Sequence, residues 1–473
     1  MSYLLCIDLG TSICKSVVYD FEFHEVSRAY RDISTIYPRL RWAEQSPEEW
    51  WKATVDTVKE TMDKGGIAPQ DLAGVAVCGQ SHGPVLLGRN GNALLPCIVW
   101  PDLRAIKQSE LIEAHIGRKA CAYYTAPKLL WIKENHPKVF NDMHKFVLPK
   151  DYIRMKLTGR ILTDVGDAMG TLMYDRRKGS WDYSLIDFIG VSHDKLPEIH
   201  KPDEVIGSVT AEGAAETGLR EDTPVIAGTG DAHSISLGLG DTVKPGGVAI
   251  YLGSAPAIFT PVKDRRFGGF MGPGGQSLRW FWGLLSPKDS KIPYELLDME
   301  AEEVEPGSEG ILFLPHLLGE RGPSYNPHAK GVLFGLNLYH RRGHIIRAMM
   351  EGIAFQLRLI LNSVRESGTM DEISEIVAIG GGAKSFVWRQ IIADVFNVPV
   401  CLPDREETAT IGLAILLSVG LGIYKDIYES SKKVGLKVAE RIEPRETYHG
   451  QYEKMFSLYV KLENALSEFF GTV

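Results

Sequence analysis

The sequence predicts an α/β protein built from two domains of related architecture. Three observations lead to this prediction: short apolar runs that end in glycine or a polar turn, helical patterns between those runs, and a strand–turn–strand pattern that occurs twice. Apolar runs of this length and punctuation suit central strands better than helices. A chain of 473 residues is also too long to fold around a single core.

The apolar runs are predicted as strands because they are short and bounded by turn residues. They cover residues 3–10, 72–80, 95–100, 223–230, 246–253 and 375–383.

The first predicted helix begins at Ser46 and extends at least to Met62. Ser46 can cap the helix, Pro47 fits the first helical position and Glu49 can complete a capping box. Apolar residues then recur at every third or fourth position, which gives the helix one apolar face. Similar patterns predict helices over residues 344–361, 386–396, 408–417 and 452–470.

The repeated strand–turn–strand pattern begins at Cys6 in CIDLGTSICKSVVYD and at Val248 in VAIYLGSAPAIF. In both copies Leu-Gly is followed by Thr or Ser, and such a hairpin can present backbone N–H groups to a phosphate oxygen. Two ordinary, unrelated hairpins are the alternative. If the copies are related, the glycine-rich link GLGDTVKPGG separates two domains, residues 1–240 and 241–473.

Composition excludes several classes of partner. A net charge of −8 offers no diffuse basic surface for nucleic acid or an anionic membrane. The six cysteines form no Cys-x-x-Cys pair, and no apolar run approaches the ~20 residues of a membrane span. The first residues also lack the basic segment of a signal peptide. We therefore expect a cytoplasmic protein that binds neither nucleic acid nor membrane. The sequence leaves the oligomeric state open, with a homodimer as the candidate.

Several catalytic signatures are absent from the sequence. There is no GxxxxGK[ST] phosphate loop, no GxGxxG fingerprint, no HExxH pair and no GxSxG elbow. These absences remove the usual P-loop, dinucleotide-binding, zinc-protease and α/β-hydrolase interpretations.

A single carboxylate, Asp231, stands out in the stretch VIAGTGDAHSISLGLG, residues 225–240. It follows glycine-spaced turn residues and precedes small residues at near-helical spacing. One interpretation is a turn or N-cap residue that bonds nearby backbone N–H groups. The other is an acid that faces a cleft and contacts substrate, and the residues alone leave both open.

Stretches along almost the whole chain resemble the FGGY family of carbohydrate kinases, and within it the xylulokinases. They include IDLGTSICK at the start, GQSHG at 79–83, YYTAPKLLWIKEN at 123–135, GTGDAHSISLG at 228–238, GVLFGLNLYHRRGHIIRAMMEG at 331–352 and GGGAKSFVWRQIIADV at 380–395. The resemblance implies two ribonuclease H-like domains, of the actin and hexokinase type, that flank a central cleft. It further implies that ATP, with Mg²⁺, phosphorylates a primary hydroxyl of a sugar, D-xylulose being the first candidate.

The resemblance also assigns roles to individual residues. Asp231 would be the catalytic base and Asp8 would orient Mg²⁺. The phosphates of ATP would contact Gly10, Thr11, Ser12 and Lys15 from the first hairpin and Gly253 and Ser254 from the second, and adenosine would contact Gly381, Gly382 and Ala383. The sugar would contact Gln80, Ser81, His82, Trp100 and Asp102.

Four motifs depart from the xylulokinase pattern. The usual Asp-Asn is Asp-Ala at 231–232, Gln-Met-His is Gln-Ser-His at 80–82, Trp-Asn-Asp is Trp-Pro-Asp at 100–102, and Gly-Thr-Ser is Gly-Ser-Ala at 253–255. Losing groups that bond a hydroxyl changes which sugar a site accepts. The alternatives are therefore a kinase for ribulose, L-xylulose, a tetritol or a glycerol-like polyol, a non-catalytic sugar- or nucleotide-binding regulator, or an actin-like or chaperone-like ATPase.

Overall fold

The chain folds into two compact units. The computed structural model describes residues 2–240, 243, 246–253, 255–262, 265–270, 274–285, 292–366, 368, 372–435 and 437–470. Unit 1 comprises Met1–Gly240 and Glu407–Gly435, and unit 2 comprises Asp241–Glu406 and Leu436–Val473.

Unit 1 is built on a mixed sheet in the order β13-β14-β5-β1-β2-β3, with β15 also pairing with β5. The neighbours β1, β5 and β14 are parallel, whereas β2, β3 and β13 pair antiparallel with their neighbours. The strands are β1 (Tyr3–Leu9), β2 (Ile13–Tyr19), β3 (Glu25–Asp32), β5 (Leu72–Gly79), β13 (Val205–Ser208), β14 (Pro224–Ile226) and β15 (Thr229–Gly230).

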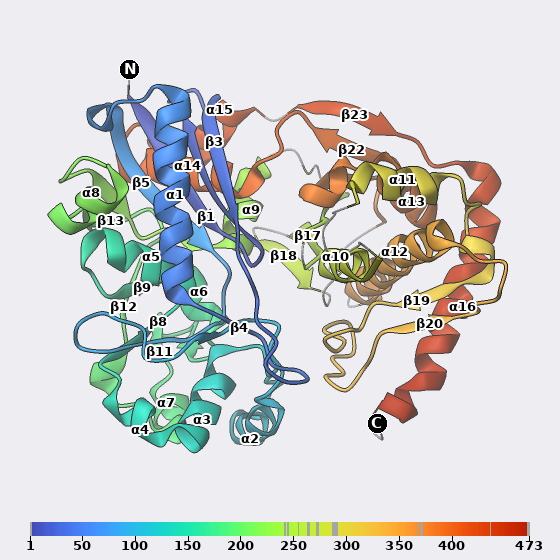
Figure 1. The fold of residues 1–473 in the computed structure, drawn as a ribbon, viewed down its shortest axis with the longest axis horizontal. Coiled ribbons are helices and arrows are strands. Elements are labelled where there is room, and N and C mark those ends of the chain that lie inside the picture. The colour runs from blue at the N-terminus through green and yellow to red at the C-terminus, as the bar shows by residue number, and fades with distance from the viewer. Residues whose placement is uncertain are drawn as a thin grey trace. The chain divides into compact units, whose positions relative to one another are not determined.

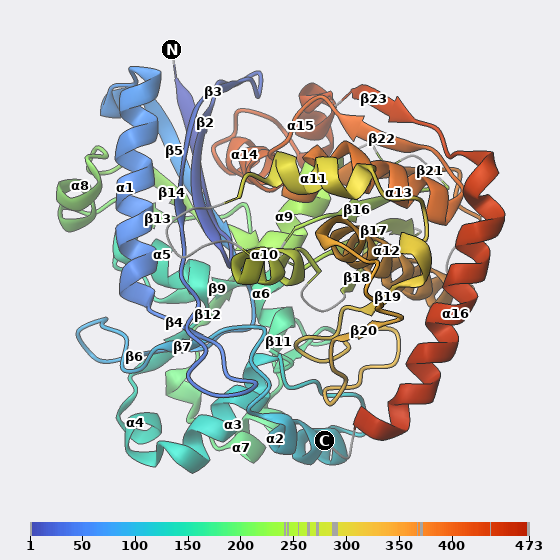
Figure 2. The same cartoon turned by 45° about the vertical axis from the view of Figure 1, so that its right-hand side comes forward.

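Helices cover both faces of this sheet. Figures 1 and 2 show α1 along one face and α14 on the other, and α14 contacts both β1 and β5. These elements enclose a core that includes Ile7, Trp50 and Val77. The helices are α1 (Pro47–Gly65), α5 (Pro149–Thr158), α8 (Ala211–Thr217), α9 (Asp231–Gly238), α14 (Thr408–Gly420) and α15 (Ile427–Val434).

The segment between β5 and β13, together with β4, which precedes α1, adds a second layer of short elements to unit 1. Its own apolar cluster is formed mainly by helices and includes Leu129, Phe146 and Ile186. The helices are α2 (Ile106–Ile116), α3 (Thr125–Asn135), α4 (Pro137–Asp142), α6 (Val165–Gly170) and α7 (Tyr183–Ile189). The strand pairs are β4 (Glu44–Gln45) with β7 (Cys97–Ile98), β6 (Val85–Leu87) with β8 (Lys145–Val147), β9 (Leu162–Asp164) with β12 (Glu198–His200), and β10 (Tyr174–Asp175) with β11 (Ser180–Trp181).

Unit 2 repeats the sheet order of unit 1, as β18-β17-β16-β21-β22-β23. The helices α12 and α13 pack together, and α16 lies along α13 (Figure 2). The strands are β16 (Gly247–Tyr251), β17 (Ala257–Val262), β18 (Arg265–Phe270), β21 (Glu375–Ile379), β22 (Val400–Pro403), β23 (Val438–Ile442), β19 (Leu312–Leu314) and β20 (Val332–Phe334). The helices are α10 (Gly274–Leu285), α11 (Tyr294–Glu302), α12 (Arg342–Glu366), α13 (Phe386–Phe396) and α16 (Glu446–Phe470).

The two sheets carry the predicted repeat. In each, the first strand pairs antiparallel with the second across a short turn and parallel with a later strand. Each predicted strand segment contains a strand, although 95–100 yields only the two residues of β7. The segment 223–230 is divided into β14 and β15 at Gly228, whose φ of 71° lies in the left-handed region. A Cβ there would lie 1.9 Å from the Val77 carbonyl oxygen, which requires glycine.

The boundary of the first unit differs from the predicted 1–240 in one respect. Glu407–Gly435 was expected to belong with the C-terminal domain, but it packs within unit 1. Gly412 and Gly238 allow the backbones of α14 and α9 to meet, since a Cβ on Gly412 would lie 1.9 Å from the Ser234 carbonyl oxygen. Ser234 Oγ also donates to the Ala409 carbonyl across the same contact, at 2.6 Å.

Two sequence expectations about the whole chain can be compared with the structure. All six cysteines are buried free thiols. Among the residues that the structure describes, no helix combines the length and apolar character needed to cross a bilayer.

Candidate active site

Asp231 is the first residue of α9 and directly follows the edge of the unit 1 sheet at β15. Its side chain is half-buried, and its Oδ1 accepts a hydrogen bond from the Ala232 backbone N–H at 2.7 Å. The local hydrogen bond expected of a helix-end aspartate is therefore present. The carboxylate also retains partial exposure, which a group that contacts substrate requires.

The surroundings of Asp231 favour its protonated form. Burial and the negative charge of Asp8 raise the pKa of the Asp231 carboxyl from 3.8 to about 7, and Asp167 adds to the rise. The bond from the Ala232 N–H acts in the opposite direction. A base is most effective when its pKa lies near the working pH, because it is then both ionised and able to hold a proton. Asp231 meets this condition.

Asp8 lies near the end of β1 and is 7% exposed. Burial raises the pKa of its carboxyl, Lys15 lowers it, and Glu407 raises it further. Its side chain contacts Cys78 Sγ at 3.5 Å from Oδ1 and Lys15 Nζ at 4.0 Å from Oδ2, and both contacts are weak. The charge of Asp8 in turn raises the pKa of the Asp231 carboxyl, so a nearby cation would favour the ionised form of both groups.

The turn between β1 and β2 only partly fits the predicted phosphate site. Gly10 donates its N–H to the Ile13 carbonyl at 3.0 Å, so that N–H closes the hairpin and is not available to a phosphate. Thr11 is buried, and its Oγ1 accepts the indole N–H of Trp100 at 2.7 Å. Ser12 is half-buried at the tip of the turn and remains our candidate for phosphate contact.

Lys15 was predicted to add positive charge near the phosphates, but its ammonium group forms an ion pair within the protein. Lys15 Nζ donates to Glu407 Oε2 at 2.9 Å, and Glu407 is the residue that immediately precedes α14. This ion pair fastens α14 to the first hairpin. We therefore leave Lys15 out of the proposed phosphate site.

His82 is held in a strained backbone conformation close to the expected sugar site. Its φ of 72° is unusual for a residue with a side chain, and such strain is often found at functional positions. Thr125 and Lys128 donate to its carbonyl at 3.1 and 3.4 Å. Its Nδ1 lies 2.6 Å from the Gly170 carbonyl, which can only accept, so Nδ1 carries the hydrogen. In the neutral ring Nε2 is then a hydrogen-bond acceptor.

The neighbours of His82 in the GQSHG motif differ in their exposure. Ser81 is half-buried and donates its hydroxyl to Asp167 Oδ1 at 2.7 Å. Gln80 is 1% exposed, and its Nε2 donates to Gln45 Oε1 at 2.7 Å. Ser81 can therefore face a ligand, whereas Gln80 supports the loop from inside, contrary to its predicted contact with sugar.

The WPDLR segment supports the site and does not line it. Both oxygens of Asp102 are engaged, by the Arg104 guanidinium and by the backbone N–H groups of Ala43 and Arg104. Because the Asp102 carboxylate is completely buried in this ion pair, we leave Asp102 out of the proposed sugar site. Trp100 is 7% exposed, and its indole N–H is directed at Thr11, so it too serves mainly to hold the hairpin.

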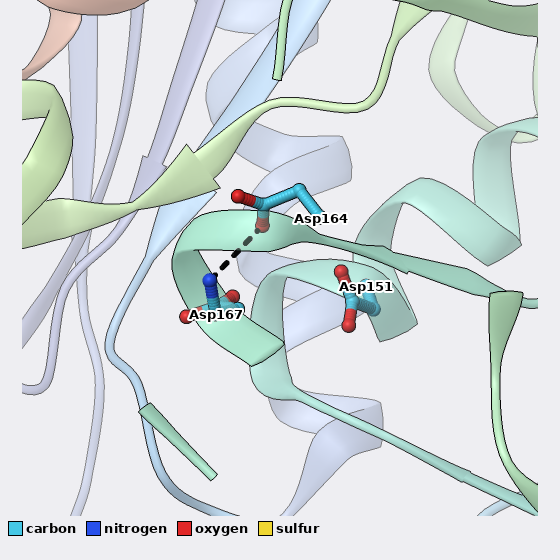
Figure 3. A group of neighbouring side chains, drawn as sticks. All are labelled: Asp151, Asp164 and Asp167. Carbon is cyan, nitrogen blue, oxygen red and sulfur yellow. Dashed lines mark hydrogen bonds between the residues drawn. The ribbon is translucent and has the colours of Figure 1, made fainter. Parts of the chain in front are cut away.

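A buried ionic network lies behind Ser81, and sequence reasoning missed it. Lys150 Nζ forms ion pairs with Asp151, with Asp164 at 2.8 Å and with Asp167 at 3.2 Å. Arg154 pairs with Asp151 at 3.0 Å, and every one of these side chains is fully buried. Figure 3 shows the three carboxylates, with the Asp167 N–H donating to Asp164. Since the Lys150 ammonium already occupies the centre of this cluster and pairs with all three carboxylates, we do not assign a metal ion to it.

The environment of Asp167 resembles that of Asp231. Burial raises its pKa to about 7; Lys150 lowers the pKa, and the charges of Asp164 and Asp151 raise it. The signal that could have revealed the network is the run of charged residues in LPKDYIRMKLTG, residues 148–159.

In unit 2, the glycine-rich turn that follows β21 has one glycine, Gly381, that is exposed to solvent. Gly382 donates its N–H to the Leu252 carbonyl at 2.8 Å, and Ala383 is a core residue at 2% exposure. Only Gly381 is exposed, with no atom near the position of a Cβ. The predicted contacts of Gly382 and Ala383 with adenosine therefore do not fit their surroundings.

The other predicted phosphate contacts in unit 2 follow β16. A Cβ on Gly253 would lie 2.2 Å from the ring of Tyr251, so a larger residue there would have to displace that ring. Ser254 lies outside the described residues.

Comparison with known proteins gives a consistent result over both units. Residues 3–238 match the N-terminal domain of the FGGY family of carbohydrate kinases, and residues 275–421 match its C-terminal domain. A xylulose kinase of Bacillus subtilis is 31% identical, over 97% of this chain and 96% of its own length. Ligand-bound xylulose kinase of Lactobacillus acidophilus has a TM-score of 0.84 at 26% identity, over the full length of both chains.

A solved structure named for a different substrate is equally similar to this chain. Gluconate kinase of Lactobacillus acidophilus has a TM-score of 0.83 at 26% identity, over 100% of this chain and 99% of that one. The two structural relatives thus agree on the fold and on sugar phosphorylation while differing in the sugar. The chain belongs to the FGGY family of carbohydrate kinases.

Proposed function

We propose that this kinase transfers the γ-phosphoryl group of ATP to a primary hydroxyl of a ketopentose, with D-xylulose giving the 5-phosphate as the first candidate. The observation that carries the proposal is Asp231, a half-exposed carboxylate whose pKa of about 7 suits a general base. The similarity to xylulose kinases over nearly the whole chain supports the choice of sugar.

Phosphoryl transfer requires alignment, charge neutralisation and a group that receives the proton of the acceptor hydroxyl. In our proposal Asp231 takes that proton while the sugar oxygen attacks the γ-phosphorus and the bond to ADP breaks. Ser81 and His82 hold the sugar through hydrogen bonds. Ser12 contacts the phosphates, and Gly381 permits close approach of the nucleotide.

Asp8 is our candidate for the Mg²⁺ site. Mg²⁺ keeps much of its water and binds through one or two carboxylates together with substrate phosphates. The donor set fits this requirement, because the Asp8 carboxylate is poorly neutralised by Lys15 at 4.0 Å. When bound, Mg²⁺ would neutralise charge on the phosphates. We also infer a cytoplasmic location, which the six free thiols support.

The proposal is tested by measuring ADP formation with ATP, Mg²⁺ and a panel of acceptors. The panel contains D-xylulose, D-ribulose, L-xylulose, glycerol and gluconate. We expect a ketopentose to stimulate ADP release most strongly, and expect Asp231→Ala to abolish turnover while ATP binding persists. Asp142→Ala, at an exposed position in the same unit, is the matched control.

Two results would contradict the proposal. ADP release that does not depend on any acceptor, and that Asp231→Ala leaves unchanged, would indicate an ATPase and not a sugar kinase. Sugar binding without turnover in the unsubstituted protein would favour the non-catalytic regulator. Gluconate as the best acceptor would overturn the ketopentose assignment alone.

A further inference from the structure

Ser81 and Asp167 form a hydrogen-bonded pair at the candidate sugar site. Ser81 Oγ lies 2.7 Å from Asp167 Oδ1, and the carboxylate accepts the only hydrogen that the hydroxyl possesses. Ser81 is half-buried, whereas Asp167 is 1% exposed. Ser81 is thus the partly exposed member of the pair, and a ligand that meets the pair would do so through Ser81 and not through the carboxylate behind it.

The Asp167 carboxylate is fixed from the other side by the buried ionic network. Its Oδ2 lies 3.2 Å from Lys150 Nζ, and its backbone N–H donates to Asp164 Oδ1 at 3.4 Å. Figure 3 shows Asp164 and Asp167 at the start of α6, with Asp151 on the neighbouring α5. Because Asp167 Oδ2 faces the Lys150 ammonium, Asp167 Oδ1 is held toward Ser81.

The pair also borders the residue that precedes the proposed base. A Cβ on Gly230 would lie 2.6 Å from Ser81 Oγ and 2.9 Å from Asp167 Oδ1. The absence of a side chain at Gly230 therefore leaves space for the Ser81–Asp167 pair. The Ser81 hydroxyl lies next to the start of α9. A sugar hydroxyl held by Ser81 would be close to the residue that receives the proton.

From this arrangement we propose that Asp167 is a positioning residue that fixes the Ser81 hydroxyl as a hydrogen-bond acceptor and thereby selects sugars that offer a hydroxyl hydrogen at one position. The inference rests on the proposed function, in that it places Ser81 in the sugar site. With its hydrogen committed to Asp167, the serine oxygen can offer only lone pairs. A carbonyl, carboxylate or ether oxygen at the same place would find no donor there.

The first test uses sugar analogues and does not require any change at Asp167. Each hydroxyl of the best sugar is replaced in turn by hydrogen or by fluorine, and binding to the unsubstituted protein and to Ser81→Ala is measured by calorimetry. The measurement is made above pH 8, where the Asp167 carboxyl, whose pKa is raised to about 7, is ionised and accepts the serine hydrogen. At one position, removal of the hydroxyl should weaken binding to the unsubstituted protein about fivefold to tenfold, the size of a net hydrogen bond. At that position Ser81→Ala should bind the deoxy and parent sugars equally.

The fluorinated analogues report which partner donates. Fluorine can accept but cannot donate, so the fluoro sugar should bind the unsubstituted protein as weakly as the deoxy sugar. Fluoro binding that matches the parent sugar would mean that Ser81 donates, and would overturn the proposal. Equal losses in both proteins at every position would overturn it as well.

The second test asks whether Asp167 acts through Ser81. In Asp167→Asn, the Lys150 ammonium keeps the amide oxygen on its own side, so the amide N–H₂ turns toward Ser81 and releases the serine hydrogen. The fluoro sugar should then bind about threefold tighter than the deoxy sugar, the lower end for a hydrogen bond. If Asp167 had only a structural role, its replacement would not change the order in which the fluoro and deoxy sugars bind.

A double-mutant cycle completes this test. In the Ser81→Ala background, Asp167→Asn should change sugar affinity less than twofold. The same loss in both backgrounds would show that Asp167 acts without Ser81 and would overturn the proposal. Ser27→Ala is the control, because Ser27 is also a buried donor in unit 1 but bonds Thr61 in α1. If Asp167→Asn does not fold, the analogue series decides alone.

Failure of this inference and failure of the proposed function give different results. Turnover of a ketopentose without any position-specific effect of Ser81→Ala contradicts the inference alone. Position-specific sugar binding without phosphorylation contradicts the proposed function alone, and the inference then holds for a binding site.

Discussion

Replacing Asp231 with asparagine should stabilise the ligand-free protein at alkaline pH, although it removes the proposed base. The folded state raises the pKa of this carboxyl from 3.8 to about 7, through burial first and the charge of Asp8 second. A carboxyl with a raised pKa holds its proton more tightly when folded. Its ionisation therefore costs stability, beginning as pH passes 3.8 and reaching the full amount above about 7.

The size of the effect follows from the shift. Each pKa unit corresponds to about 1.4 kcal/mol, so the upper limit is about 4 kcal/mol at high pH. Asp231 is only half-buried, and solvent screening reduces the expected gain to about 2 kcal/mol. For a domain of this size, that gain raises the Tm by about 4–8 °C. At pH 5 about a third of the gain should remain.

Thermal unfolding of the ligand-free protein at pH 5 and pH 8 tests this reasoning. The Tm of Asp231→Asn should exceed that of the unsubstituted protein, and the difference should be larger at pH 8. Asp142→Asn, an exposed change in the same unit, should show little difference at either pH. A variant that is no more stable at pH 8, or whose gain is the same at both values, would refute the proposed electrostatic environment.

Three further predictions follow from the same structure. Lys150→Met leaves buried carboxylates without their ammonium and should cost about 3–5 kcal/mol in chemical denaturation, whereas the exposed Lys52→Met should cost little. Gly412→Ala places a methyl group 1.9 Å from a carbonyl oxygen of α9 and should lower the Tm or prevent folding; Gly450→Ala, in open space on α16, should be tolerated. Finally, kcat/KM should fall about tenfold per pH unit below about pH 7 if ionised Asp231 is required, and a flat profile down to pH 5 would contradict that role.

Elements specified by local sequence were predicted well. The predicted helix 386–396 has the bounds of α13, because Ser385 caps its N-terminus and Asn397 ends it in the left-handed conformation. The two hairpins were also visible, since strand, glycine turn and strand are adjacent in the chain. Such features need no knowledge of distant contacts.

Features that depend on distant partners were not predictable in the same way. α14 is buried from Thr408 to Ser418 on all sides, so no face of its sequence indicates which unit it joins. The sequence suggests that Asp102 is a site residue. Its carboxylate instead accepts a hydrogen bond from the backbone N–H of Ala43, 59 positions away, which no local pattern indicates. The charges of α5 look like an ordinary exposed face, but Lys150 points into a buried cluster. In each case tertiary contact decides whether a polar group is functional or structural.

The central claim is that this protein phosphorylates a sugar with Asp231 as the base. It is tested most directly by following sugar phosphate and ADP together, with saturating ATP and Mg²⁺, in the unsubstituted protein and in Asp231→Asn. We predict equal amounts of the two products from the unsubstituted protein, and a rate about 10²–10⁴-fold lower in the variant at unchanged sugar affinity. Sugar phosphate formed by Asp231→Asn at the unsubstituted rate would contradict the account.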